Sequence, residues 1–194
     1  TVVGYQQIQG DQYAALYSET LTVELENEFL PFLYPNQYVN FSPDSEASKL
    51  ALSMVSEDTA DVDALKQIYN YVVNNLTYDY DKAETVETGY LPDVDETLST
   101  KTGICFDYAA LTTAMLRSCD IPCKLQIGYT GDIKHAWIDV YIRSKGWVTG
   151  AVSFNGDSWS LMDPTFDSSA DSDDTEAIQD YIGNADNYTV QFTR

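Results

Sequence analysis

A cysteine, a histidine and an aspartate stand in an order that could support nucleophilic catalysis: Cys105, His135 and Asp163. His135 is the only histidine of the chain. A thiol that attacks a carbonyl needs an imidazole to move its proton and an acceptor to fix the tautomer of that imidazole. The three residues therefore predict a Cys-His-Asp triad, with the cysteine as nucleophile, the histidine as general base and acid, and the aspartate orienting the histidine.

Each of the three residues also has an ordinary structural interpretation. Cys105 follows Thr102-Gly103-Ile104 at the expected start of a helix, where N–H groups favour a thiolate and can bind an oxyanion. Taken alone, however, a free cysteine is more often buried and inert. A lone histidine is more often structural, and an aspartate before Pro164 could simply cap a turn. The case for chemistry rests on the three residues together.

The elements that must position these residues are helices followed by strands. Apolar side chains recur at steps of three and four residues after Ser45 and again after Asp61, which is typical of amphipathic helices. Residues 104–118 are apolar nearly all round, which predicts a buried helix with Cys105 near its start. From Cys123 onward the apolar period is two, which predicts an antiparallel meander. This order of elements predicts an α+β domain.

Within the meander, His135, Trp137 and Asp139 should share one strand face while the alternate residues supply the core. Neighbouring strands would then bring Asp163 beside His135. The C-terminal tail is expected to add a helix turn and an edge strand.

Three other stretches receive different interpretations. Residues 11–30 have a loosely helical spacing and end at Pro31. Residues 81–102 are rich in Glu, Thr, Gly and Pro, and their lack of a helical period predicts a long loop. Residues 167–176 are acidic but lack the glycine of a calcium-binding loop, which favours a solvated loop. We expect residues 1–44 to be an extension packed on the core and residues 45–194 to be the catalytic domain.

Composition excludes several classes of function. The 194 residues carry 31 acidic and 10 basic side chains, and a net charge of −21 repels nucleic acid and anionic membrane surfaces. No apolar run is long enough to cross a membrane. One histidine without a Cys-x-x-Cys pair argues against a zinc site, and we predict no metal and no cofactor. Cys119 and Cys123 could form a tight bridge or remain small core residues, and the second interpretation is favoured.

Four motifs follow one another along the chain: Gly103-x-Cys105 with Tyr108-Ala109, Arg117 with Ile121-Pro122, His135-x-Trp137, and Asp163-Pro164-Thr165. In this order they resemble the transglutaminase-like superfamily of papain-type cysteine enzymes, with coverage from about residue 45 to residue 166. The upstream helix that leads to Tyr78-Asp79 also fits. The sequence departs from the family pattern only in its hinge, where Asp120 replaces a usual Gly and Cys123-Lys124 replaces a small residue and Arg.

This resemblance implies a papain-like fold, the triad named above and acyl chemistry through a thioester. It also implies an oxyanion site built from the backbone N–H of Cys105 and an upstream side chain, for which Tyr78 is the candidate and Tyr80 its rival. Trp137 either lines the cleft or packs in the core.

The substrate would be a peptide or protein amide. Water as the second nucleophile would give a peptidase or amidase, and a lysine amine would give a transglutaminase. The compact, acidic chain favours a bacterial, secreted or cell-surface member. The alternative is a non-catalytic extracellular module that binds protein or glycan on the same scaffold. The oligomeric state cannot be read from the sequence.

Overall fold

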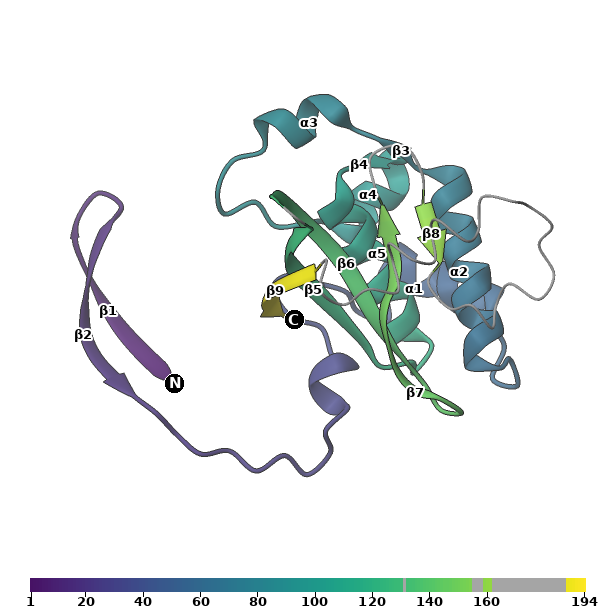
Figure 1. Ribbon diagram of the computed structural model, residues 1–194, viewed down its shortest axis with the longest axis horizontal. Helices are drawn as coiled ribbons and strands as arrows, with labels where there is room; N and C mark the ends of the chain where they lie inside the picture. Colours follow the sequence, from purple (N-terminus) through teal and green to yellow (C-terminus); the bar gives the residue numbers. More distant parts are fainter. Residues whose placement is uncertain (131, 155–158, 162–187) are drawn as a thin grey trace.

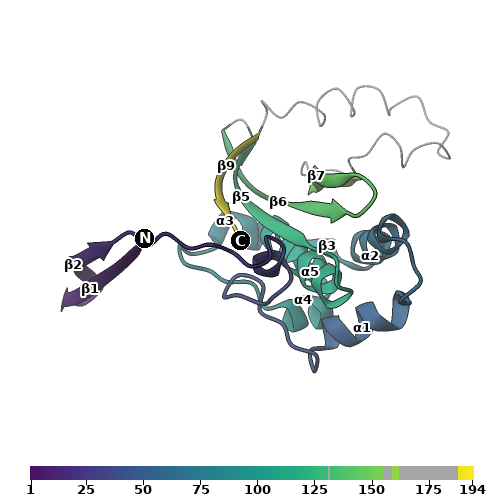
Figure 2. The same ribbon diagram turned by 90° about the horizontal axis from the view of Figure 1, so that it is seen from below.

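The computed structural model describes residues 1–130, 132–154, 159–161 and 188–194, which form a helical layer packed against an antiparallel sheet (Figure 1). Figure 2 shows the larger helices gathered on one side of the sheet. The predicted α+β class, with helices first and strands after them, is confirmed. In the described part of the chain, no helix is long and apolar enough to cross a membrane.

Among the described residues, three helices pack around a buried one, and a short fourth helix, α3, lies outside them. Helix α1 begins directly after Ser45 and helix α2 begins at Asp61, as their apolar periods predict. Helix α5 is buried over most of its length, also as predicted, and contacts α1, α2 and α4. A helix that is apolar all round can only be satisfied inside a core. The helices span Glu46–Met54 (α1), Asp61–Asn75 (α2), Tyr80–Thr85 (α3), Val94–Thr100 (α4) and Cys105–Ser118 (α5).

The main sheet has five antiparallel strands in the order β8-β7-β6-β5-β9. Alternation along β6 is confirmed, because Ala136, Ile138 and Val140 belong to the hydrophobic core while His135 and Trp137 lie on the opposite face. The predicted edge strand near the C-terminus is β9. The strands span Cys123–Thr130 (β5), Ile133–Ile142 (β6), Gly146–Phe154 (β7), Trp159–Leu161 (β8) and Tyr188–Thr193 (β9).

The order of strands corrects one expectation about the meander. Strand β8, which precedes Asp163 in the sequence, pairs with β7, and β7 in turn pairs with β6. The strand that carries His135 is therefore not a direct neighbour of β8. Strand β7, which comes between the two in the sequence, also lies between them in the sheet.

The prediction of a long loop over residues 81–102 is wrong, because the segment contains most of α3 and all of α4. Each helix begins at an aspartate whose carboxylate accepts backbone N–H groups. Asp79 accepts from Lys82, and Asp93 accepts from Asp95 and Glu96. Helices of six or seven residues are too short to display an apolar period, so only these capping residues could have indicated them.

The helical interpretation of residues 11–30 is also wrong. Residues Val2–Gln9 (β1) and Gln12–Glu19 (β2) form an antiparallel hairpin that projects away from the core (Figures 1 and 2). Its tyrosines and aliphatic residues are exposed on both faces. The apolar spacing of this segment is misleading, because a strand with two exposed faces does not require apolar and polar side chains to alternate.

Residues 29–41 pack on the core, unlike the hairpin. Phe29 and Phe32 lie against Trp147, with ring centroids 6.3 and 5.4 Å apart, and Val39 is fully buried. Residues Leu30–Phe32 form a 3-10 turn between these contacts.

A buried arginine joins this segment to the helices and the sheet. The guanidinium of Arg117, on α5, donates to the backbone carbonyls of Cys123, Tyr34 and Arg194 at 2.8 to 3.0 Å. Only a planar, multiply donating group can satisfy acceptors on three chain segments at once. Arg117 therefore fixes α5 relative to β5 and both flanking segments.

Candidate active site

Cys105 is the first residue of α5, and a carboxylate two residues along the helix holds the turn before it. Asp107 is completely buried and accepts the backbone N–H of Ile104 at 2.8 Å. Gly103 is needed beside it, because a Cβ at that position would lie 2.6 Å from the Cβ of Asp107. The Gly-x-Cys motif thus has a local physical cause: the glycine lets the carboxylate fold back over the start of the helix.

The thiol of Cys105 faces three hydrogen-bond donors. Its Sγ accepts from the backbone N–H groups of Ala136 and Phe106 and from the hydroxyl of Tyr78, and each of these contacts lowers the pKa of the thiol. Burial acts more strongly in the other direction, and the charge of Asp107 adds to it. The net result is a Cys105 pKa above the usual value. This differs from the thiolate that the helix N-terminus predicts, because loss of hydration exceeds the donor contribution.

His135 is also buried, with 8% of its surface exposed. Burial lowers its pKa to about 4, from an ordinary value of 6.5. Its ring stacks on Trp137, with centroids 6.2 Å apart and planes 19° from parallel. His135 therefore rests as a neutral imidazole at neutral pH, the form that can accept a proton.

Cys105, His135 and Tyr78 line one cavity of about 840 Å³. The start of α5, strand β6 and the short strand β3 (Thr77–Tyr78) bring them there. Strand β3 pairs in parallel with β4 (Thr102–Gly103), which ends two residues before Cys105, so it holds Tyr78 beside Cys105. The structure thus brings together the cysteine, the histidine and one oxyanion candidate that the sequence singled out.

The two tyrosine candidates occupy different environments. The backbone N–H of Cys105 donates to the hydroxyl of Tyr78, and burial together with the nearby thiol raises the pKa of Tyr78 to about 12. Tyr78 therefore remains a protonated donor at neutral pH. Tyr80 contacts the ring of Tyr78 at 4.9 Å, is 58% exposed and does not line the cavity.

The other predicted site residues lie elsewhere. Trp137 is fully buried behind His135 and does not line the cavity. Asp163 lies outside the described residues. All three cysteines are free, with Cys123 buried and Cys119 half-buried.

The sequence analysis did not predict a polar cluster that lies beside Cys105. The ammonium of Lys82 donates to the carboxylate of Asp107 at 2.8 Å and to the hydroxyl of Tyr90 at 2.7 Å, and Tyr90 also donates to Asp107 at 2.5 Å. These contacts anchor α3 and the following loop to the start of α5. The signal that could have indicated this was an aspartate placed two residues after a candidate nucleophile, in the first turn of an otherwise apolar helix.

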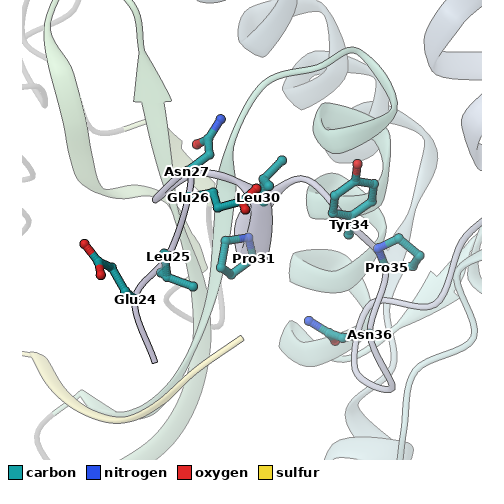
Figure 3. Close-up of a pocket in the computed structure, with 9 residues that line it drawn as sticks. All are labelled: Glu24, Leu25, Glu26, Asn27, Leu30, Pro31, Tyr34, Pro35 and Asn36. Carbon is teal, nitrogen blue, oxygen red and sulfur yellow. The ribbon is translucent and has the colours of Figure 1, made fainter. Parts of the chain in front are cut away.

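A second cavity, of about 520 Å³, is lined by residues that precede α1 in the sequence (Figure 3). Its lining contains no cysteine and no histidine. All its lining residues come from one segment, and its ionisable carboxylates are Glu24 and Glu26. In the described ranges, no group of three or more potential metal ligands gathers. The residues drawn in Figure 3 are Glu24, Leu25, Glu26, Asn27, Leu30, Pro31, Tyr34, Pro35 and Asn36.

Two curated proteins resemble parts of this chain. UPF0252 protein MJ1282 of Methanocaldococcus jannaschii is 40% identical over 62 residues, which cover 29% of this chain and 18% of that protein. Uncharacterized protein YebA of Bacillus subtilis is 26% identical over 154 residues, which cover 68% of this chain and 21% of that protein. The chain thus spans about a fifth of the length of either relative.

A solved structure shares the fold. A protein of Cytophaga hutchinsonii, described as a proposed cysteine protease, is 19% identical with a TM-score of 0.54, and the match covers 88% of this chain and 48% of that one. The sequence model of the transglutaminase-like superfamily, named Transglut_core, matches residues 48–150. These residues make up more than half of the chain and include Cys105 and His135. The protein belongs to the transglutaminase-like superfamily.

Proposed function

We propose that the protein is a cysteine-nucleophile enzyme that transfers acyl groups from peptide or protein amide bonds through a thioester. Cys105 is the nucleophile, His135 the general base and acid, and Asp163 the residue that orients the imidazole. The observation that carries the proposal is the cavity in which Cys105, His135 and Tyr78 meet.

The proposed reaction proceeds in two halves. Sγ of Cys105 attacks the amide carbonyl carbon while its proton passes to His135, and the tetrahedral oxyanion is held by the Cys105 N–H and the Tyr78 hydroxyl. The C–N bond then breaks, and His135 returns the proton to the departing amine. In the second half, water or a second amine gives its proton to His135, attacks the thioester and releases the thiol.

The resting ionisation state supports this sequence of steps. Burial raises the pKa of Cys105 and lowers that of His135, so both groups are neutral before substrate binds. A neutral imidazole can take the thiol proton as the attack begins, which makes His135 a general base rather than one half of a standing ion pair. The Tyr78 hydroxyl and the backbone N–H of Cys105 lie next to each other beside the thiol, which supports their proposed role as the two donors to the oxyanion.

The first test is the alkylation rate of Cys105 by iodoacetamide, with each modified cysteine identified by peptide mass mapping. We expect Cys105 of the wild-type protein to react faster than Cys119, whose pKa burial raises to about 11. His135→Ala should slow Cys105 by roughly a hundredfold or more, because general-base assistance is lost. Cys119 serves as an internal control, since its rate should be the same in both proteins.

The opposite result would favour the second candidate function, a non-catalytic binding module. The raised pKa of Cys105 is the observation that favours it. If Cys105 reacts no faster than Cys119 and is indifferent to His135→Ala, the enzyme proposal fails.

A further inference from the structure

The cavity also has an apolar wall, whose members are Tyr38, Val86, Tyr90, Leu91, Phe106, Ile127 and Phe192. Tyr38, Phe106 and Tyr90 form a continuous aromatic surface, with Phe106 ring centroids 6.4 Å from Tyr38 and 6.3 Å from Tyr90. The guanidinium of Arg194 lies over the rings of Tyr38 and Phe192, at 4.7 and 5.0 Å, and joins the wall to strand β9. Ile127 on β5 adds an aliphatic surface.

Several side chains of this wall remain exposed to solvent although they line a concave surface. Phe192 is 49% exposed, Leu91 is 44% exposed and Val86 is 37% exposed. Large apolar side chains gathered at the mouth of a cavity are typical of a site that a ligand covers. A ligand that covers these side chains would remove their apolar surface from water, which favours binding.

Few charged groups lie on the same surface. Among the described residues that line the cavity, Glu87 is the only carboxylate and Lys134 the only side-chain ammonium, and the guanidinium of Arg194 lies over the rings of Tyr38 and Phe192. A charged substrate side chain would be desolvated there against aromatic rings, which is costly. The amide of a glutamine side chain would likewise lose water over the apolar part of the wall.

From these observations we infer that the site selects acyl donors with a bulky aromatic or aliphatic side chain next to the scissile bond, which the wall of Phe192, Leu91, Tyr90 and Phe106 receives. This inference rests on the proposed function and adds the substrate class to it. It places Phe192 and Leu91 as specificity-determining residues on two different elements, the edge strand β9 and the loop after α3.

The test uses acetylated tripeptides that end in a vinyl methyl ester and carry Phe, Leu, Ala, Gln or Asp at the last position. Addition of the Cys105 thiol forms a bond from Sγ to the β-carbon, and the thiol proton is transferred to the α-carbon, so no further reactant is needed. Each second-order rate is divided by the iodoacetamide rate of the same variant. We expect the Phe and Leu probes to react at least tenfold faster than the Ala, Gln and Asp probes.

Three variants test whether the preference comes from the residues that line the cavity. Phe192→Ser and Leu91→Ser should each bring the Phe probe close to the Ala probe. Val190→Ser is the matched control, because Val190 lies on the same strand, is 48% exposed and does not line the cavity. It should leave the preference unchanged.

Binding to Cys105→Ala distinguishes a failure of the inference from a failure of the chemistry. The same peptides are titrated as simple amides and followed by calorimetry. Tighter binding of the Phe peptide, lost in a Cys105→Ala, Phe192→Ser double variant, supports the apolar site even if no probe reacts. If Cys105 is activated by His135 but the five probes react alike, or the Gln or Asp probe is preferred, the inference is overturned while the proposed function stands.

Discussion

His135 is the only histidine, so its titration can be followed without assignment. Burial lowers its pKa to about 4, and the unfolded chain therefore binds a proton at this residue between about pH 6.5 and pH 4 that the folded protein does not. Acidification through this window favours unfolding, by up to roughly 3 kcal/mol from this one group. Urea unfolding across the window should show a smaller loss of stability for His135→Gln than for the wild-type protein.

The titration of His135, followed by NMR, also tests Asp163, the third member of the proposed triad. A carboxylate beside an imidazole raises its pKa, whereas burial lowers it, and we expect burial to dominate at His135. Asp163→Asn should therefore lower the pKa of His135 further, as measured by NMR of the ring protons. An unchanged titration would contradict the role proposed for Asp163, and a wild-type pKa above 6.5 would show that burial does not dominate.

Asp107, next to the site, is fully buried and forms an ion pair with Lys82. Lys82→Met removes the ammonium while the buried carboxylate keeps the Tyr90 hydroxyl and the Ile104 N–H. We expect a loss of about 1–3 kcal/mol in the free energy of unfolding. The pKa of Cys105 should also rise further, because the charge of Asp107 already raises it.

Urea unfolding and the pH profile of Cys105 alkylation measure the two effects. Lys49→Met is the control, because Lys49 pairs with Glu46 on the surface and both side chains are largely exposed. Equal behaviour of the two lysine variants would contradict a role for the cluster.

At the scale of elements, the attachment of strand β9 determines whether Phe192 lines the cavity. Gly128 lies where β5 meets β9, and a Cβ at this position would lie 1.9 Å from the carbonyl oxygen of Thr189. Gly128→Ala should therefore separate the two strands locally, at a cost of about 1–3 kcal/mol. Hydrogen exchange should show lost protection in residues 189–193 and in their partners on β5.

Gly89→Ala is the control for this substitution, because nothing lies within 4 Å of a Cβ at Gly89. Its positive φ of 93° adds backbone strain but leaves β9 untouched. Retained protection of β9 in Gly128→Ala would mean that the strands can shift to accommodate the methyl group.

At the scale of the whole molecule, the N-terminal hairpin is separate from the layers of helix and sheet. An isolated two-stranded hairpin is marginally stable, and the side chains of β1 and β2 are exposed almost throughout. Deleting residues 1–19 should change the midpoint of urea unfolding little and leave the alkylation rate of Cys105 unaltered. A clear loss of stability would show that the hairpin packs on the core in solution.

Sequence patterns were sufficient where the local residues decide the structure. The apolar periods of α1, α2 and α5 and the alternation along β6 predicted those elements, because each buries one defined face or its whole surface. The order of motifs predicted the family and the meeting of Cys105 with His135 in one site. The interpretation failed at α3 and α4, whose short length hides any period, and at the hairpin, where no buried face imposes one.

Local pattern and motif order were enough to predict the fold class, the family and the residue types available for the proposed chemistry. The ionisation of the site depends on tertiary packing, since burial by distant segments raises the pKa of Cys105 and lowers that of His135. Tertiary packing also places Tyr78, and not Tyr80, beside the thiol and in the lining of the cavity. The Lys82–Asp107–Tyr90 cluster and the apolar wall join residues far apart in the chain, and no local pattern encodes such contacts.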